Sequence, residues 1–164
     1  LVARFGSRAY FGDASRLHIL EAAQTRKARA FVLAIDDVEA SVRTAEIVCR
    51  HFPDVPVFAR ARNRQHAHRL MDLGIKHIRR ETLLSALDLT REVLGGLGFS
   101  NAETSRMTDA FRQHDERRLF EDYADYTDQQ KLQVKARKYQ EELVELFKRD
   151  AEGLSPDTPE DGKG

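Results

Sequence analysis

The sequence predicts an α/β fold built on a parallel sheet, followed by a helical C-terminal extension. Short apolar runs alternate with helix-like stretches up to about residue 97. The run over residues 30–35 is apolar throughout, as expected for a parallel strand covered on both faces. Beyond residue 98 only helical spacing of apolar residues is found. The strand and Gly-rich turn that open a nucleotide-binding sheet are absent, so we expect only part of such a sheet.

Four strands and three intervening helices follow from the spacing of apolar residues. Asp13 is placed to cap the first helix, Pro53 ends the second, and Gly74 stops the third. The predicted strands cover residues 8–12, 30–35, 55–61 and 75–78, and the predicted helices cover residues 14–23, 38–52 and 64–73.

The sequence predicts helices and a polar tail in the second half of the chain. A helix is predicted over residues 82–97, a second begins after Ser100 and runs past Arg112, and a third covers residues 129–150. The composition of residues 153–164 predicts disorder. We therefore expect an α/β domain at 1–98, a helical extension at 99–152 and a disordered tail at 153–164.

The composition of the chain limits which classes of function are possible. The chain has 164 residues, zero formal net charge and one cysteine, Cys49, which excludes an internal disulfide. Its first 80 residues carry 15 Lys and Arg against 8 Asp and Glu, spread without a basic tract, which favours anionic small ligands over nucleic acid. No apolar run approaches the ~20 residues of a membrane span. Because no Met opens the chain, we expect a fragment cut on its N-terminal side.

Three short segments that follow predicted strands are the candidate ligand site. The carboxyl ends of parallel strands meet at one edge of the sheet, where ligands bind. Asp13 and Ala14 follow the first strand, and Arg60 and Arg62 end the third. The second strand is followed by an acidic pair beside small and apolar residues, namely Ala34, Ile35, Asp36 and Asp37. The segments together predict half of a nucleotide crevice.

Each of these residues also has a purely structural interpretation. Asp13 and Asp37 are placed to cap helices, an interaction worth about 1 kcal/mol. Two arginines two residues apart on a strand project to the same side, where they can hold a phosphate or carboxylate. They are equally placed to pair with Asp36 and Asp37 across neighbouring strand tips, and the sequence leaves both alternatives open.

The remaining titratable residues predict neither a metal site nor a catalytic centre. Arg79, Arg80 and Glu81 form a second basic point on the same edge, where Glu81 is placed to orient an arginine. His66 and His68 are two residues apart on a predicted helix and point to different faces, so we expect no metal there. No arrangement of Ser, His and Asp and no phosphate-binding loop is found, so we expect no enzyme.

The run from Phe5 to Gly98 resembles the regulator-of-potassium-conductance domain, also called KTN or TrkA-N, of bacterial potassium efflux antiporters. The Kef family of glutathione-regulated potassium/proton antiporters resembles it most, over about 110 residues. The motifs that carry the resemblance are Arg4-Phe5-Gly6, Tyr10-Phe11-Gly12-Asp13-Ala14-Ser15-Arg16, Ala34-Ile35-Asp36-Asp37, His51-Phe52-Pro53, Ala59-Arg60-Ala61-Arg62, Arg80-Glu81-Thr82 and Phe111-Arg112-Gln113-His114-Asp115.

The resemblance implies a partial Rossmann-like domain, lacking its first Gly-rich βαβ half, on the cytoplasmic side of the bacterial inner membrane. It implies a membrane antiporter domain upstream in the same polypeptide, a homodimer through the regulatory domain, and AMP or NAD(H) as regulatory nucleotide. Asp13 and Ala14 would lie at the adenine end, and residues 34–37 beside the ribose and phosphates. Arg80 matches a glutathione-contacting arginine, whereas Asp115 stands where the glutathione-gated members carry asparagine.

Two functions from different classes follow. The first is a ligand-sensing domain that controls potassium efflux through an antiporter. The alternative is part of an NAD-dependent dehydrogenase, which would need a substrate domain and a proton-transfer residue near the nicotinamide. A soluble Trk-type regulator of potassium uptake is a third interpretation.

Overall fold

The computed structural model describes residues 12–152, and the chain divides into two compact units. The sheet unit comprises residues 1–86 and the helical unit residues 87–164. The predicted strand over residues 8–12 and the predicted disordered tail lie largely or wholly outside the described residues. The domain limits expected at residues 98 and 152 stay predictions. No helix described for this chain is long and apolar enough to cross a membrane.

The sheet is parallel, which confirms the predicted fold class. It consists of β1 (Phe31–Leu33), β2 (Val57–Ala61) and β3 (His77–Arg80) in that order. Leu33 lies opposite Ala59 in the first pairing, and Ala59 lies opposite Ile78 in the second. All three strands therefore end at one edge, which we call the carboxyl edge.

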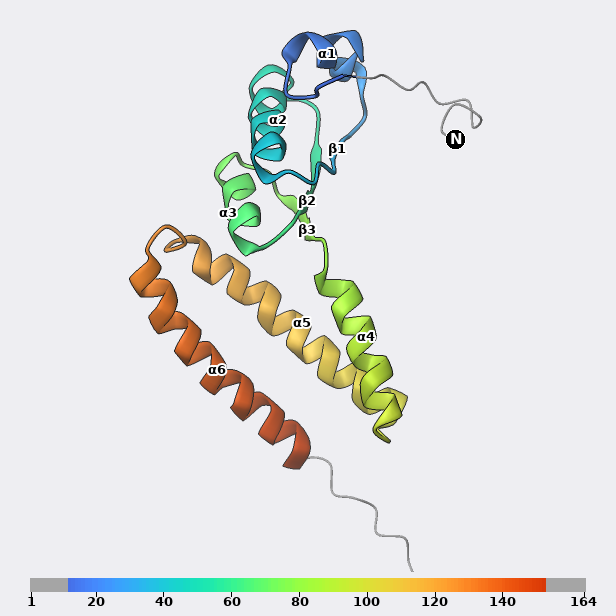
Figure 1. Ribbon diagram of the computed structural model, residues 1–164, viewed down its shortest axis with the longest axis vertical. Helices are drawn as coiled ribbons and strands as arrows, with labels where there is room; N and C mark the ends of the chain where they lie inside the picture. Colours follow the sequence, from blue (N-terminus) through green and yellow to red (C-terminus); the bar gives the residue numbers. More distant parts are fainter. Residues whose placement is uncertain (1–11, 153–164) are drawn as a thin grey trace, which may run out of the picture. The chain divides into compact units, whose positions relative to one another are not determined.

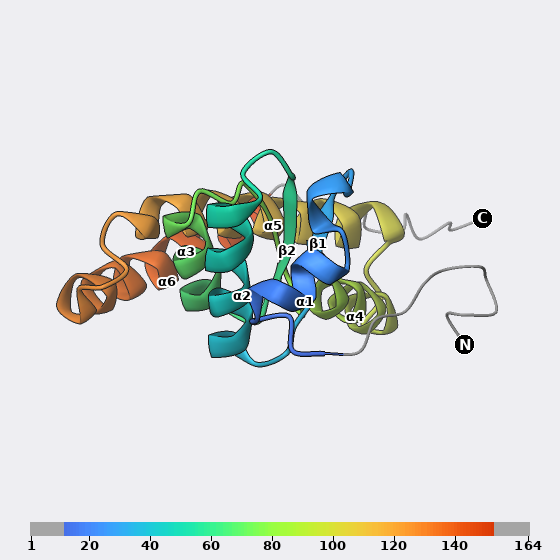
Figure 2. The same cartoon turned by 90° about the horizontal axis from the view of Figure 1, so that it is seen from above.

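Helices α2 (Val38–His51) and α3 (Arg64–Asp72) connect the strands and cover one face of the sheet. Figures 1 and 2 both show these helices on the same side of β2. Apolar side chains of α2 and α3 face this side because they recur at helical spacing. The most buried members of the resulting core are Leu33, Ala45, Val48, Ala61, Ala67 and Leu70.

The opposite face of the sheet is exposed. Val32 is 72% exposed and Phe58 is 42% exposed. Phe58 stacks on His77, with ring centroids 4.6 Å apart. The apolar run of β1 was predicted to be covered on both faces, whereas the described residues cover only one.

The first described helix begins later than its sequence predicts. α1 (Leu17–Ala22) has Arg16 at its N-cap, without a side-chain cap, and a short 3₁₀ turn, η2 (Thr25–Lys27), follows it. The prediction that Asp13 caps this helix is therefore wrong. One carboxylate oxygen of Asp13 instead accepts hydrogen bonds from the backbone N–H and the hydroxyl of Ser15, at 2.9 and 2.7 Å. This local turn delays the helix by one turn.

The fourth predicted strand is displaced by two residues, because Ile75 belongs to the end of α3. Gly74 has φ +80°, and its N–H donates to the carbonyl of Met71. The N–H of Ile75 donates to the carbonyl of Leu70, and Ile75 is buried. These bonds form a Schellman motif, which uses an apolar residue after the glycine as part of the helix end. β3 begins only at His77.

The helical unit contains most of α4 (Leu83–Gly96), with α5 (Asn101–Tyr123) and α6 (Gln129–Glu152). All three helices match predictions from the sequence. Ser100 caps α5 through a capping box, in which its hydroxyl accepts from the N–H of Glu103 and the Glu103 carboxylate accepts from the N–H of Ser100. α5 and α6 are in contact with one another.

Candidate functional site

Three sequence-predicted residues meet at the carboxyl edge: Asp36, Arg60 and Arg62. β1 ends at Leu33, so residues 34–37 form the loop that leads into α2. Arg60 lies one residue before the end of β2, and Arg62 lies one residue beyond it. The crossing from one strand to the next brings these segments together, although about 25 residues separate them in sequence.

Arg60 is the centre of this cluster. Its Nη2 donates to the carbonyl oxygen of Ala34 at 3.0 Å and pairs with the carboxylate of Asp36. Its Nη1 lies 3.8 Å from a carboxylate oxygen of Glu81, which follows β3. One guanidinium thus ties together the ends of all three strands. The ion-pair alternative for Arg60 and Asp36 is confirmed.

Asp36 remains accessible despite this pairing, since its side chain is 80% exposed. Arg62, just beyond the end of β2, donates from Nη1 to the backbone carbonyl of Asp36, at 3.4 Å. Both guanidinium groups therefore surround the loop after β1. An exposed carboxylate beside two arginines offers an acceptor for hydroxyl groups and donors for an anion.

Asp37 has a structural role that the sequence predicted. Its Oδ1 accepts a hydrogen bond from the N–H of Ala40 at 2.7 Å, which caps α2. Ala34 is exposed and Ile35 is half-buried, so the backbone between β1 and Asp36 is open to close approach. The two adjacent acids are thus separated in role: Asp37 caps the helix, and Asp36 pairs with Arg60.

His66 supports this edge from the buried side and was not predicted to do so. The backbone N–H of Arg62 donates to Nδ1 of His66 at 3.1 Å, and Nε2 lies 3.1 Å from the hydroxyl oxygen of Ser41. Because Nδ1 accepts, the ring is neutral and Nε2–H donates to Ser41. Burial lowers the pKa of His66, which favours this neutral form. The ring fixes the exit of β2 against α2.

Asp13 and Ala14 lie away from these contacts. The polar contacts of Asp13 go to Ser15 and Arg16, and the hydrogen bonds from Ser15 lower the pKa of its exposed carboxyl group. Ala14 packs against the core cluster of Leu20 and Val48. Their predicted place at an adenine ring stays a prediction.

The two residues matched to a glutathione site lie in different units. Arg80 ends β3 and is half-buried, whereas Asp115 lies in α5 and is buried. The pairing of these residues on one ligand also stays a prediction.

Within residues 12–152, no group of three or more His, Cys, Asp or Glu side chains is arranged to hold a metal ion. His66 and His68 are both buried in α3. Sequence reasoning weighed them only as metal ligands and so missed the contact of His66 with Ser41. The signal in the sequence was Ser41, a polar residue on the first turn of α2, whose buried hydroxyl lies beside His66 of α3.

Two family models match the chain, one over each unit. The model described as the TrkA-N domain matches residues 1–81, and the model described as the potassium efflux system KefB C-terminal domain matches residues 85–162. The two matches meet at the start of α4, close to the division between the units.

A solved structure is also similar to this chain. It is described as the Shewanella denitrificans Kef C-terminal domain in AMP-bound form. The two proteins share 37% sequence identity over an alignment covering 72% of this chain and 77% of that one, with a TM-score of 0.68.

Proposed function

This chain belongs to the Kef family of C-terminal regulatory domains of potassium efflux systems, and from that membership we propose that it binds an adenine nucleotide at its carboxyl edge. Nucleotide binding regulates potassium efflux through an antiporter domain to which the regulatory domain is attached. AMP is the first ligand to test, because a similar Kef domain has been solved in AMP-bound form. NAD(H) is the second, because the sequence resemblance implies AMP or NAD(H) as the regulatory nucleotide.

The observation that carries this proposal is the Asp36–Arg60–Arg62 cluster. Open α/β sheets bind ligands beyond the carboxyl ends of their strands. The exposed carboxylate of Asp36 is suited to accept hydrogen bonds from ribose hydroxyls. The guanidinium groups of Arg60 and Arg62 are suited to a phosphate group, to which arginine binds through paired N–H donors.

The cluster also provides a switch. Arg60 contacts Ala34, Asp36 and Glu81 at once. A phosphate that draws Arg60 away loosens the tie between the strand ends, and β3 leads through Glu81 directly into α4. Regulation requires that the nucleotide bind one arrangement more tightly than the other.

Calorimetric titration with AMP and NADH tests the proposal through Asp36→Asn and Arg62→Ala. Removing a charge-assisted hydrogen bond costs about 1.5–3 kcal/mol, which is roughly a tenfold or greater loss of affinity. We expect that loss for both variants. Asp54→Asn and Arg50→Ala are matched controls, since both residues are exposed and precede β2, away from the carboxyl edge. Equal losses in variants and controls, or no heat with either nucleotide, would contradict the proposal.

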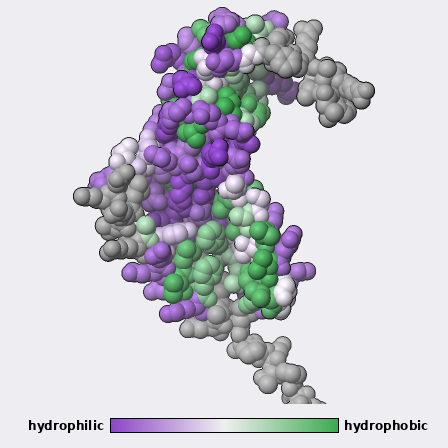
Figure 3. Space-filling model, in the orientation of Figure 1, coloured by the Kyte–Doolittle hydropathy of each residue, from purple (hydrophilic) through white to green (hydrophobic). Residues whose placement is uncertain are grey.

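We also propose that the domain functions as a homodimer, with α4 contributing to the contact. Apolar surface gathers over α4 in Figure 3. Leu89 and Val93 of α4 and Leu97, the residue just after it, follow at four-residue spacing and are 61%, 54% and 71% exposed. Such a stripe on one helix face is expected to be covered in the assembled protein.

A glutathione site at Arg80 and Asp115 is a further proposal. An asparagine donates a hydrogen bond to a carboxylate of glutathione, whereas the ionised carboxylate of Asp115 only accepts hydrogen bonds. The substitution therefore argues for weak glutathione binding in this member of the family.

A further inference from the structure

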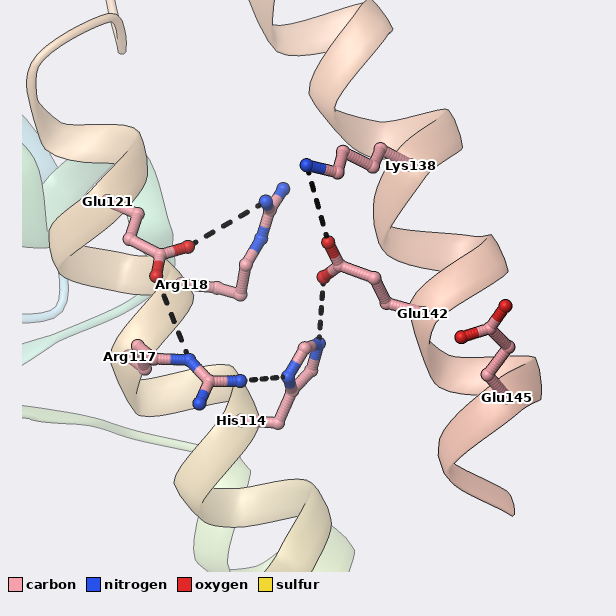
Figure 4. Close-up of a pocket in the computed structure, with 7 residues that line it drawn as sticks. All are labelled: His114, Arg117, Arg118, Glu121, Lys138, Glu142 and Glu145. Atoms are coloured by element: carbon pink, nitrogen blue, oxygen red, sulfur yellow. Dashed lines mark hydrogen bonds and ion pairs between the residues drawn. The ribbon is translucent and has the colours of Figure 1, made fainter. Parts of the chain in front are cut away.

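A cleft of about 520 Å³ in the helical unit lies between α5 and α6 and is lined almost entirely by charged side chains. Figure 4 shows the side chains of the two helices pointing toward one another across it. Its lining residues are His114, Arg117, Arg118, Glu121, Lys138, Glu142 and Glu145. The proposed nucleotide site uses none of them.

His114 is buried in this cleft, with a side chain that is 10% exposed. Its Nδ1 lies 2.7 Å from Nη2 of Arg117 on α5, and its Nε2 lies 3.7 Å from a carboxylate oxygen of Glu142 on α6. The ring stacks on Tyr139 of α6, with centroids 5.2 Å apart. His114 therefore contacts α6 through both its ring face and its Nε2 edge.

The contact with Arg117 fixes the protonation state of the ring. Arginine only donates, so Nδ1 must accept and the proton is carried on Nε2, facing Glu142. A second proton on Nδ1 would set two donors against one another at 2.7 Å. A second arginine, Arg118, lies over the ring of Tyr139.

Nearby carboxylates partly oppose the effect of the arginines on protonation of His114. Glu142 and Glu121 attract a protonated ring, while burial, Arg117 and Arg118 disfavour it, and the net result is a lowered pKa for His114. The charged groups that face the ring are thus Arg117, Arg118 and Glu121 from α5, and Lys138, Glu142 and Glu145 from α6.

We propose that His114 makes the contact between α5 and α6 an acid-released latch, closed while the ring is neutral and opened when the ring takes up a proton. Protonation breaks the Arg117 contact and places a third cation beside two arginines. The opened state relieves the repulsion between these cations by exposing the ring to water. The latch goes beyond the proposed nucleotide site and is independent of it.

The sign of the pH effect follows from linkage. A histidine whose pKa is lowered in the folded state stabilises that state above its ordinary pKa of about 6.5. This stabilisation is lost as the pH falls below that value. For an antiporter that exchanges potassium for protons, such a latch would couple the regulatory domain to cytoplasmic acidity.

Amide hydrogen exchange of the full chain between pH 7.5 and 5.5 tests the latch. The opening constant of α6, corrected for the intrinsic exchange rate, is expected to rise as the pH falls. The rise is limited to about tenfold per pH unit, because one proton is taken up. The range stops at pH 5.5 to stay above the ordinary range of carboxyl groups.

His114→Gln is the decisive variant, because glutamine offers a carbonyl oxygen to Arg117 and an amide N–H to Glu142 but does not titrate. It should keep α6 protected and flatten its pH dependence. His51→Gln, an exposed histidine in the sheet unit, should retain the wild-type dependence.

A second readout does not depend on any variant folding. The ring protons of His114, followed by NMR in the wild-type chain, should titrate with a midpoint below about 6.5. Opening of α6 that is independent of pH, a dependence retained in His114→Gln, or a midpoint above 6.5 would each overturn the latch.

Discussion

Arg60 illustrates at the residue scale how one side chain serves both the fold and the proposed ligand. Its contacts with Ala34, Asp36 and Glu81 join three strand ends. Its side chain is only partly exposed, whereas that of Asp36 is largely in solvent. Surface ion pairs of this kind contribute about 0–1 kcal/mol to stability. We therefore infer that this arrangement matters more for ligand binding than for folding.

His66 provides the first residue-scale prediction. His66→Ala removes the acceptor for the N–H of Arg62 and leaves a cavity beside Ser41, so we expect a loss of about 2–4 kcal/mol in the free energy of unfolding. Ser41→Ala removes only one hydrogen bond and should cost about 1 kcal/mol. Urea denaturation of the sheet unit, followed by circular dichroism, measures both. Equal losses for the two variants would show that His66 contributes no more than its bond to Ser41.

The same residue predicts a pH dependence. Burial lowers the pKa of His66 in the folded state, so the stability it contributes is fully present above about pH 6.5 and declines as the pH falls. The difference in unfolding free energy between wild type and His66→Ala should therefore shrink from pH 7.5 to pH 5.5. A difference that grows over this range would contradict the neutral tautomer.

Asp115 gives a prediction for the proposed second ligand. Asp115→Asn replaces a carboxylate with an amide that donates to carboxylate oxygens. We expect glutathione to bind the variant at least tenfold more tightly than wild type, as measured by calorimetry. Asp109→Asn is a suitable control, because Asp109 lies on the same helix and pairs with Arg91 and Arg112. Equal affinities of wild type and Asp115→Asn would remove this position from the glutathione site.

At the scale of elements, α2 begins with a side-chain cap, Asp37, that was predicted from the sequence. Asp37→Ala removes the acceptor for the N–H of Ala40 and should lower the free energy of unfolding by about 1 kcal/mol. Asp54→Ala changes an exposed aspartate outside any helix and should stay within about 0.5 kcal/mol of wild type. Thermal unfolding of both variants checks this, and a loss no larger than that of the control would mean that the cap is redundant.

Elements with strong periodicity were predictable from the sequence, and two errors in the placement of elements have local causes. α2, α3 and the long helices follow from apolar spacing, a capping residue and a terminating glycine or proline. Asp13 was misassigned because its carboxylate bonds to Ser15 and forms a turn before the helix. Ile75 was misassigned because a Schellman motif takes the first apolar residue after Gly74. Both depend on hydrogen bonds that hydrophobic periodicity does not report.

The candidate site was predictable in composition but only partly in detail. Strand ends at one edge follow from a parallel sheet, so Asp36, Arg60 and Arg62 were expected together. Asp36 rather than Asp37 pairs with Arg60 because the carboxylate of Asp37 caps α2. The sequence does not specify which of the two acids pairs with Arg60. The support from His66 and Ser41 depends on how α2 and α3 pack, which no local pattern specifies.

At the scale of the whole molecule, the sheet unit supplies the proposed nucleotide site and the helical unit supplies apolar surface and the α5–α6 cleft. α4 contains the division between the units, so we propose it as the element through which a change at the strand ends reaches the second unit. In this proposal, nucleotide binding and its transmission belong to different parts of the chain.

The exposed stripe on α4 predicts the oligomeric state. Sedimentation equilibrium should show a dimer for the wild-type chain and a shift toward monomer for Val93→Glu, which places a charge at the centre of the stripe. Val144→Glu, at a similarly exposed apolar residue on α6, is the control. A wild-type chain that remains monomeric at high concentration would contradict the proposed contact.

The most direct test of the proposed nucleotide site is an NMR titration of the backbone amides with AMP. The largest shifts are expected at residues 34–37 and 60–62, with residues 53–56, before β2, left unchanged. Shifts confined to the start of β2 or to the cleft between α5 and α6, with the strand ends unaffected, would contradict a nucleotide site at the carboxyl edge.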